Sequence, residues 1–243
     1  LLYFLFSCFV LGSDSLSIGF WNIENLFDLE NDPSIRDDEF AIGGKKNVTR
    51  DIYELKIERS VEVLTDLNVD ILGLCEVENI SVLIELNNSY KGRDYKIIHF
   101  DSPDVRGIDN ALLYDQNKFS VLVSKAIENK LGGDDKTRDI LYVKGSFLDV
   151  TLHIFVNHWP SNYGGKQGAI PKRKSTAELL MRQIQTIQKN DKLAEIILVG
   201  DFNEDPNDDN VKILEQLGFI NQMSSMMGDK GKGTYVYRGK DYF

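Results

Sequence analysis

One apolar run that ends in an acid and an amide constrains this chain more than any other stretch. Residues 195–199 are mainly aliphatic, Gly200 follows as a turn residue, and Asp201 and Asn203 stand two positions apart. Side chains at positions i and i+2 leave a strand on the same face, so we expect both groups to point together from the strand's carboxyl end. Carboxylate and amide oxygens suit Mg²⁺ and phosphate chemistry. The same residues also make ordinary Asx turns, so the interpretation depends on the rest of the chain.

Three other strand-like runs end in polar side chains in the same way. Asn22 closes a run that begins at Ser15, Glu76 stands near the end of the apolar run 69–77, and His158 stands near the end of the run 150–159. Runs of this composition are typical of buried strands. We therefore predict that several strands bring one set of polar groups to a common rim: Asn22, Glu76, His158, Asp201 and Asn203.

Length and composition favour one α/β domain. The chain has 243 residues, no Pro/Gly/Ser-rich linker and no internal repeat, and its 42% hydrophobic content is enough for a core. The net charge is −10, from 38 acids and 28 bases. This balance argues against a protein that coats nucleic acid through a basic patch, and it is compatible with a site that recruits divalent cations.

The first residues resemble part of a secretory signal. Residues 1–12 are almost wholly apolar and too short to span a bilayer as a helix, and Gly12 and Ser13 provide a cleavage point. We therefore expect residues 1–13 to be a signal remnant and residues 14–243 the domain, with a secreted, periplasmic or cell-surface location and no stable membrane insertion. A buried first strand is the alternative. Of the two cysteines, Cys8 would leave with the signal, and Cys75 is typical of a small buried hydrophobe.

Periodicity predicts strands and helices in alternation. Helical spacing is expected over 51–67, 82–86, 171–189, where the helix would start on Pro171, and 210–217. The apolar face of the first helix would include Ile52, Leu55, Val61, Leu64 and Leu67. Strands are expected over 15–23, 69–77, 95–100, 110–114, 119–127, 140–148, 150–159 and 196–199, with a polar surface loop over 31–47. Many strands with helices before and between them predict α/β layers.

The order of these motifs resembles the endonuclease/exonuclease/phosphatase superfamily, which includes pancreatic deoxyribonuclease, inositol-phosphate phosphatases and neutral sphingomyelinases. The resemblance runs from Ser17 to the last residue. It implies a four-layer α/β/β/α sandwich of two mostly antiparallel sheets flanked by helices. It also implies a metal-dependent hydrolase that acts on phosphoester bonds.

Metal and catalytic roles follow from the residue types and from this resemblance. Glu76 is the expected ligand of Mg²⁺, with Mn²⁺ or Ca²⁺ as alternatives, and Glu78 points to the same face by period and is the alternative ligand. His158 would hydrogen-bond the phosphate in the transition state or protonate the leaving oxygen. Asp201 would activate the nucleophile or hold it near the metal. The amides of Asn22 and Asn203 would contact phosphate oxygens or orient a carboxylate.

Basic residues are expected on the substrate side. Arg138 heads a strand and would contact a substrate phosphate, as a comparable arginine does in relatives, and Arg106 would face substrate in the same way. Asp109 or Asn110 would shape the site, and a surface loop before a strand explains this stretch nearly as well. Residues 172–174 are a basic cluster that either steers a polyanion or forms the solvated first turn of a helix.

The chain departs from the family pattern at its last residues. The family ends in an Asp-His pair, and no histidine follows His158 here. We expect a polypeptide clipped at both ends, inactive as written and active when complete. The expected function is that of a secreted, nuclease-like, monomeric phosphodiesterase acting on a phosphoester substrate, with nucleic acid as the first choice. The alternatives are a phosphatase or sphingomyelinase-type enzyme, or a non-catalytic binding module of the same fold.

Overall fold

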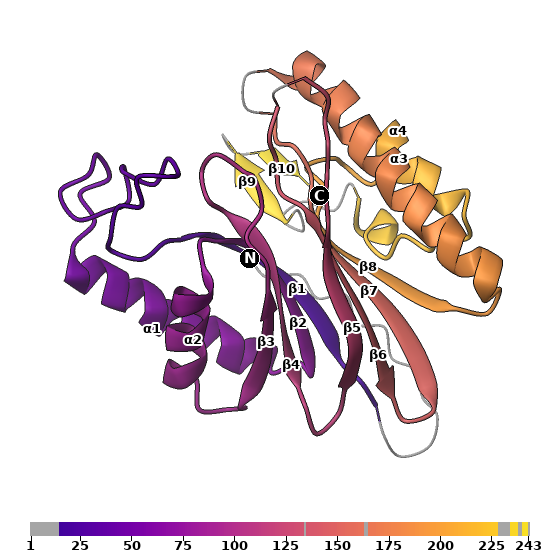
Figure 1. Ribbon diagram of the computed structural model, residues 1–243, viewed down its shortest axis with the longest axis horizontal. Helices are drawn as coiled ribbons and strands as arrows, with labels where there is room; N and C mark the ends of the chain where they lie inside the picture. Colours follow the sequence, from indigo (N-terminus) through magenta and orange to yellow (C-terminus); the bar gives the residue numbers. More distant parts are fainter. Residues whose placement is uncertain (1–14, 134, 163–164, 228–233, 238–239, 243) are drawn as a thin grey trace.

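The computed structural model describes residues 15–133, 135–162, 165–227, 234–237 and 240–242. The predicted signal remnant, with Cys8, lies outside this part of the chain. Two four-stranded sheets form the middle of the molecule (Figure 1). The first has the order β1-β2-β4-β3 and the second β5-β6-β7-β8.

The first sheet carries helices on its outer face (Figure 1). Its strands are β1 (Ile18–Leu26), β2 (Ile71–Val77), β3 (Tyr95–His99) and β4 (Asp109–Asp115). The helices are α1 (Arg50–Leu67) and α2 (Ile80–Ser89). Strand β1 runs parallel to β2, and the other two pairs are antiparallel. The side chains of Thr49 and Asn79 cap the amino ends of the two helices by accepting backbone N–H groups.

The second sheet repeats this arrangement on the other side of the molecule. Its strands are β5 (Ser120–Ile127), β6 (Ile140–Phe147), β7 (Val150–His158) and β8 (Glu195–Asp201), with α3 (Lys166–Asn190) and α4 (Asp209–Glu215) outside them. Only β7 and β8 pair in parallel. A 3₁₀ turn (Ser224–Met226) and a hairpin of β9 (Tyr235–Tyr237) and β10 (Lys240–Tyr242) follow. The predicted four-layer sandwich of two mostly antiparallel sheets is confirmed.

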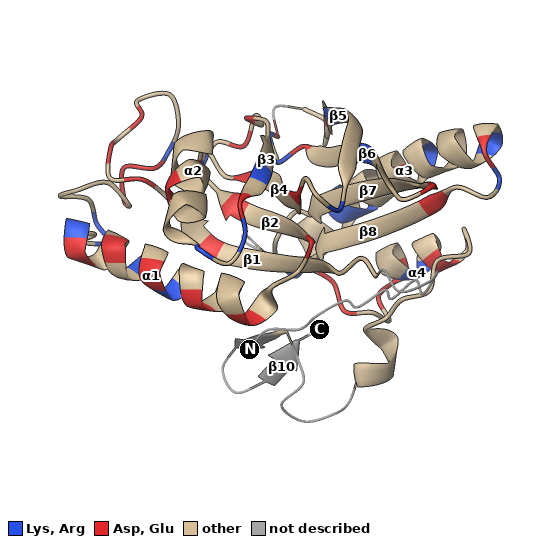
Figure 2. Cartoon of the chain, turned by 90° about the horizontal axis from the view of Figure 1, so that it is seen from below, with Lys and Arg blue, Asp and Glu red and all other residues tan. Residues whose placement is uncertain are grey.

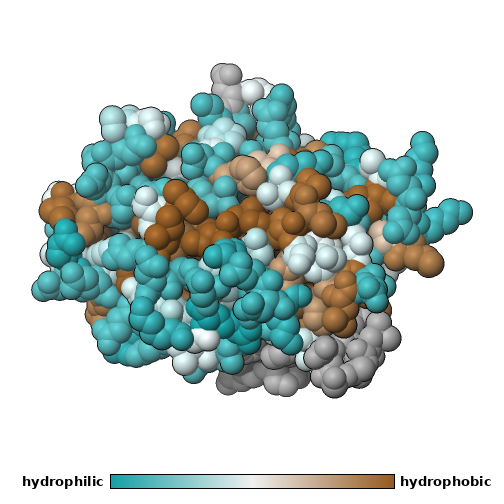
Figure 3. Space-filling view, turned by 60° about the horizontal axis from the view of Figure 1, so that its bottom comes forward, coloured by the Kyte–Doolittle hydropathy of each residue, from teal (hydrophilic) through white to brown (hydrophobic). Residues whose placement is uncertain are grey.

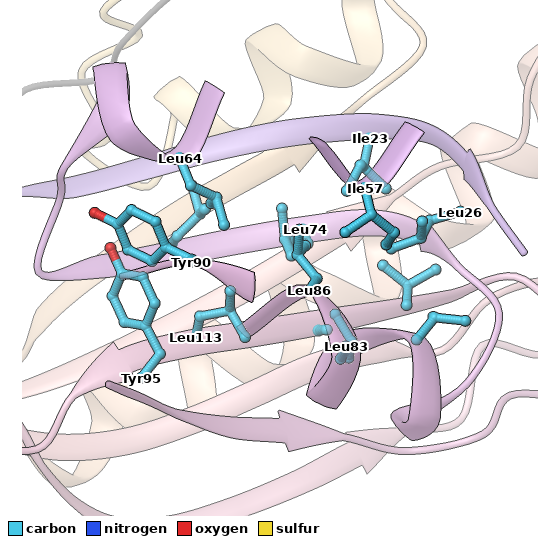
Figure 4. Close-up of a cluster of buried hydrophobic side chains, with 14 of the residues drawn as sticks. Ile23, Leu26, Ile57, Leu64, Leu74, Leu83, Leu86, Tyr90, Tyr95 and Leu113 are labelled. Carbon is cyan, nitrogen blue, oxygen red and sulfur yellow. The ribbon is translucent and has the colours of Figure 1, made fainter. Parts of the chain in front are cut away.

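Three apolar layers hold these four layers together. The first lies between the α1/α2 pair and the first sheet, where Leu64, Leu74 and Leu86 pack together (Figure 4). The second lies between the sheets and includes Ile71 and Ile154, and the third lies beneath α3 and α4. Alternate residues of one strand face different layers, because successive side chains point to opposite faces. The nearly continuous apolar sequence of β2 reflects burial on both faces.

Two details of the predicted helices are wrong. In α1 the buried stripe is Tyr53, Ile57, Ser60, Leu64 and Leu67, whereas Ile52 and Leu55 are about half exposed. The rotation of a helix about its axis decides which side chains face the sheet. Apolar residues occur on more than one side of α1, so their spacing does not fix this rotation. Helix α3 starts at Lys166, so Pro171 lies inside it. Pro171 has no backbone N–H, so one helical hydrogen bond is missing close to the amino end of α3. The turn before it nevertheless packs against the protein, because Ala169 is buried.

Strands β1 and β8 are the outer strands of their sheets on the same side of the sandwich, and they contact each other (Figure 2). Within the described residues each pairs with one neighbour only. Phe20, Trp21, Ile197 and Leu198 are half-buried there. Figure 3 shows a band of apolar residues across this face. No helix among the described elements is both long and apolar enough to cross a membrane.

Candidate active site

Four polar side chains from both sheets meet where β1, β2, β7 and β8 end. The Nδ2 atom of Asn22 donates to Glu76 Oε1 at 3.3 Å and to Asp201 Oδ2 at 3.1 Å. His158 Nε2 lies 3.8 Å from Glu76 Oε1. We call Asn22, Glu76, His158 and Asp201 the rim cluster. The structure therefore brings together four of the five side chains predicted to share one rim.

Backbone irregularities aim the carboxylate of Glu76 at this point. Glu76 has a φ of 62°, and the pairing of β2 with β4 shifts register between Cys75 and Val77. The pairing of β1 with β2 shifts between Asn22 and Leu26, where Glu24 and Asn25 also have positive φ. Bulges of this kind bend a strand and redirect a side chain, and positive φ in non-glycine residues is found at functional sites. Simple alternation along the strands does not predict this arrangement.

Gly200 lets β7 and β8 approach closely just before the rim. A Cβ atom at this position would lie 2.3 Å from the carbonyl oxygen of Asn157. The parallel register pairs Asn157 with Gly200 and His158 with Asp201. The backbone N–H of Trp159 then donates to the carbonyl of Asp201 at 2.8 Å. Glycine is therefore required for the pairing that sets His158 beside Asp201.

Burial and charge shift the proton affinities of the cluster in opposite directions. Burial raises the pKa of Glu76, the hydrogen bond from Asn22 opposes this shift, and the nearby Asp201 adds to it. Burial lowers the pKa of His158 well below its usual value, and the charges of Arg138 and Arg106 lower it further. The imidazole is therefore neutral at neutral pH in the free protein. Its Nδ1 atom is buried without a hydrogen-bond partner among the described residues.

The donor set fits a hard divalent cation. Glu76 and Asp201 are held to one amide group of Asn22, so two carboxylates lie close together in a mainly buried setting. A cation there would offset the repulsion and the burial that raise the pKa of Glu76. Carboxylate oxygens are the ligands that Mg²⁺, Mn²⁺ and Ca²⁺ take. The predicted ligand Glu76 is thus in a position to hold such an ion.

The two predicted arginines share one buried acid. Asp104 accepts from Arg138 Nη1 at 3.0 Å and from Arg106 Nε at 3.2 Å. Arg138 is buried and its Nη2 donates to the carbonyl of Trp159 at 2.7 Å, whereas the side chain of Arg106 is 43% exposed. Arg106 is therefore the arginine that an incoming phosphate can reach. A phosphate contact by either residue stays a prediction.

Asn203 does not point with Asp201. Strand β8 ends at Asp201, and Asn203 has a φ of 51°, so the two-residue period of a strand no longer applies. Its Nδ2 donates to the carbonyl of Trp159 at 2.9 Å, and its backbone N–H donates to Asp201 Oδ1 at 2.9 Å. The expectation that both side chains leave the strand together is wrong. Asn203 instead ties the turn after β8 to the turn after β7.

Glu78 faces away from the rim cluster. Its Oε2 atom accepts from the backbone of Asp28 at 2.7 Å and from Asn79 Nδ2 at 3.2 Å. The register shift next to Glu76 breaks the alternation that would have put both acids on one face. Burial raises the pKa of Glu78 to about 7, and the carboxylates of Asp28 and Asp37 contribute. The alternative metal ligand is therefore part of a separate buried acidic group.

Replacing Glu78 with glutamine is expected to stabilise the protein in mild base. The folded state holds the proton of Glu78 more tightly than the unfolded chain, whose value is 4.5. The protonated carboxyl of Glu78 therefore makes its full contribution to stability below pH 4.5, and this contribution is lost as pH rises through about 7. Melting temperatures across this range should show Glu78→Gln gaining on the wild type at higher pH. A constant difference between the two curves would contradict the assignment.

Two other histidines lie outside the rim cluster. His99 Nε2 lies 3.1 Å from Asp109 Oδ2, and His153 Nδ1 is 2.8 Å from the hydroxyl of Tyr142. His99, Asp109 and the exposed Asp101 offer ligand atoms within 4.8 Å of one another, a second grouping that a cation can occupy. Asn110 donates to the carbonyl of Asp139 at 2.7 Å.

Several residues around the site were not predicted, and for all but Arg173 nothing in the local sequence distinguishes them. Asp104 lies in a loop, yet it is the buried counter-ion of both arginines. Arg173 belongs to the predicted basic cluster, but it is fully buried against Glu204 and is therefore neither solvated nor able to meet a polyanion. Lys174 in the same cluster is exposed, and steering of a polyanion by the cluster's lysines stays a prediction. Lys56 reaches from α1 to donate to the carbonyl of Ile23 at 2.6 Å, beside the bulge in β1. An unusual charge on an apolar helix face was the signal available for Arg173.

Comparisons with known proteins identify the family of this chain. A sequence model of the endonuclease/exonuclease/phosphatase family matches residues 17–243. A search of curated protein sequences finds no match. The chain belongs to the endonuclease/exonuclease/phosphatase family, whose members are phosphoester hydrolases.

Solved structures share the fold at low sequence identity. TDP2 from Caenorhabditis elegans is 19% identical with a TM-score of 0.55, over 77% of this chain and 47% of that one. A mannosyl-6-phosphatase from Bacteroides thetaiotaomicron is 17% identical with a TM-score of 0.57, over 84% and 71%. ANGEL2, a 2',3'-cyclic phosphatase, is 15% identical with a TM-score of 0.58, over 82% and 56%. The chain thus spans less than half of the TDP2 chain, and these likenesses establish the fold.

Proposed function

We propose that this protein is a divalent-metal-dependent phosphoesterase that hydrolyses phosphodiester bonds in the manner of a nuclease. The observation that carries the proposal is the rim cluster. Two acids, an amide and a neutral histidine come from both sheets to one point, with hydrogen bonds linking Asn22 to Glu76 and to Asp201. Cleaving a phosphodiester requires an aligned water and neutralised oxygen charge, and these residue types supply both when a cation is bound.

Each residue of the rim cluster has a role that its surroundings support. Glu76, with Asp201 beside it, would hold Mg²⁺, which when bound polarises the phosphate and lowers the pKa of a water molecule. Asp201 accepts hydrogen bonds on both oxygens, which would orient its carboxylate to align an attacking water. The neutral imidazole of His158 donates a hydrogen bond to a phosphate oxygen, a role that its lowered pKa favours over proton donation to the leaving group. Asn22 holds the two carboxylates close together by donating to both of them.

An open pocket beside the arginines supports a substrate larger than a single phosphate. Its volume is about 430 Å³, which is within the size range of ligand sites. Asp104 forms part of its wall and also binds Arg106 and Arg138. Arg36 and Lys136 line it, and neither makes an ion pair with a described residue. On a chain of net charge −10, two cations in a pocket that shares Asp104 with both arginines favour a substrate with a further negative charge, such as the next phosphate of a nucleic acid.

Reversing both pocket charges is expected to weaken binding of a nucleic acid while sparing a small diester. Arg36→Glu/Lys136→Glu should lower the affinity for a single-stranded oligonucleotide about tenfold or more, and reduce its salt slope by about one per cation removed. Turnover of bis-p-nitrophenyl phosphate should be unchanged, because this small diester lacks the further phosphate that the two cations would bind. Fluorescence anisotropy at several salt concentrations measures the affinity.

The matched control for this variant is Lys91→Glu/Lys192→Glu. It makes the same change in net charge with two exposed lysines in the loops before β3 and β8, at the ends of these strands away from the rim. If both double variants lose affinity equally, the effect is one of total charge and the pocket does not bind the substrate.

We also propose that the protein acts outside the cytoplasm. The apolar run over residues 1–12 supports this location, and it suits a hydrolase of extracellular or periplasmic phosphoesters. Expression of the complete gene in its host, with fractionation and amino-terminal sequencing of the product, tests it. An unprocessed protein confined to the cytoplasm would contradict the location.

The activity itself is tested with the protein at its full length. We expect hydrolysis of bis-p-nitrophenyl phosphate in Mg²⁺, and none in EDTA. Turnover of p-nitrophenyl phosphate alone would assign the protein to the phosphatases. Tight binding of phosphoesters without turnover of either compound would favour a non-catalytic binding module.

A further inference from the structure

We propose that Arg173 is a positioning residue which, through its ion pair with Glu204, holds the turns that follow His158 and Asp201 at a fixed separation. The proposal rests on the proposed function for its catalytic consequence. Its structural content is independent of any substrate. It concerns a residue of helix α3 whose hydrogen bonds go to Glu204, Pro160 and Asn162 and to no member of the rim cluster.

Arg173 is completely buried and reaches two separate turns. Its Nε atom donates to Glu204 Oε1 at 2.5 Å. Its Nη1 atom donates to the carbonyl of Pro160 and to Asn162 Oδ1, both at 3.0 Å. Pro160 comes two residues after His158, and Glu204 comes three residues after Asp201. One guanidinium group therefore connects both turns to α3.

The two turns are also joined directly, nearer to the cluster. The backbone N–H of Trp159 donates to the carbonyl of Asp201 at 2.8 Å, and Asn203 Nδ2 donates to the carbonyl of Trp159 at 2.9 Å. On the far side, Asn210 Nδ2 donates to Glu204 Oε1 at 2.8 Å, which orients the carboxylate from α4. The Arg173–Glu204 pair thus forms the outer of two layers of cross-links between the turns.

Energetics indicate that the pair serves geometry more than stability. Two charges are removed from water here, and the Nη2 atom of Arg173 is buried with no partner among the described residues. Replacing a buried ion pair with apolar side chains of similar size is often neutral for stability, whereas removing one partner is costly. A planar guanidinium can donate in two directions at once, which an ammonium group does less well. This geometry is what two separate turns require.

A loss of the pair is expected to misplace His158 relative to Asp201. Displacements of about 1 Å in a catalytic site cost about 100-fold in rate. Substrate affinity should change little, because Arg106 and the pocket residues lie outside the two turns.

The test uses the complete protein and the double variant Arg173→Met/Glu204→Met. Hydrogen exchange of the peptides covering residues 158–162 and 201–204 should become faster, and this readout does not depend on activity. The melting temperature should stay near that of the wild type, while kcat for bis-p-nitrophenyl phosphate falls about 100-fold at a nearly unchanged KM. Unchanged exchange in both peptides together with an unchanged kcat would overturn the proposal.

Two further variants separate this outcome from general damage. Arg173→Lys keeps the charge and loses the fork, so exchange should still be faster in residues 158–162 even if the double variant fails to fold. Arg93→Met removes another mainly buried guanidinium. It binds Asp70, just before β2, and Asp115, at the end of β4, both on the side of the sheet away from the rim cluster. That control should lower stability and leave kcat intact. If no wild-type turnover is found, the exchange data alone decide the proposal.

Discussion

His158→Ala is expected to lower kcat for bis-p-nitrophenyl phosphate by about 10²- to 10³-fold, the usual cost of removing one hydrogen-bond donor to a developing oxyanion. The expected loss is large because the imidazole is buried at the rim, 3.8 Å from Glu76, and its Nδ1 atom has no partner among the described residues. In the proposed role, its removal would leave a phosphate oxygen without a donor, while the fold retains its apolar layers. Steady-state kinetics with Mg²⁺ in the complete protein measure the effect.

A second buried histidine on β7 provides the matched control. His153 bonds to Tyr142 and lies outside the rim cluster, so His153→Ala should lose stability with little change in kcat. Equal losses of kcat in the two variants would mean that His158 acts only through the fold.

The lowered pKa of His158 also predicts a loss of stability as pH falls below 6.5. Below this pH the unfolded chain binds a proton at His158, whereas the folded state keeps the imidazole neutral.

Glu76→Gln is expected to weaken Mn²⁺ or Mg²⁺ binding about 100-fold or more, since even outer-shell changes at metal sites cost about 10- to 100-fold. Glutamine keeps the shape and the acceptor for Asn22 but loses the charge that attracts a cation. The raised pKa of Glu76 has a further consequence for the wild type. Metal affinity should increase as pH rises through the range in which this carboxyl ionises, because the ion competes with the proton.

Calorimetric titration of each variant with Mn²⁺ measures this change. Glu78→Gln is the control two residues along the chain, where the side chain turns away from the rim toward Asp28. Its metal affinity should match the wild type. If Glu78→Gln loses metal binding and Glu76→Gln retains it, the ion lies in the other acidic group and the assignment of the metal to Glu76 is wrong.

The sequence predicts most of the fold and the gathering of the rim cluster. Aliphatic runs ending in polar residues mark β1, β2, β7 and β8, and their order resembles one family of phosphoester hydrolases. The side chains of Asn22, Glu76, His158 and Asp201 meet as expected because the carboxyl ends of these strands lie together. A continuous apolar run is a local sequence pattern, and it is a strong signal of a strand that is buried on both faces.

Features that depend on tertiary contacts are not predictable in this way. The left-handed backbone at Glu76 and Asn203 breaks the two-residue period, so Glu78 and Asn203 take positions that alternation does not give. The burial of Arg173 depends on Glu204, which is distant in sequence. The rotation of α1 is set by the sheet beneath it, which leaves Ile52 and Leu55 exposed.

The most direct test of the rim cluster as a phosphodiesterase centre is a plasmid-nicking assay with the complete protein. Wild type, His158→Ala, Glu76→Gln and His153→Ala are compared side by side, each in Mg²⁺ and in EDTA. We predict nicking by the wild type and by His153→Ala in Mg²⁺ only, and loss of nicking in the two rim variants. Mg²⁺-dependent nicking that persists in both rim variants would contradict the assignment of the active site to this cluster.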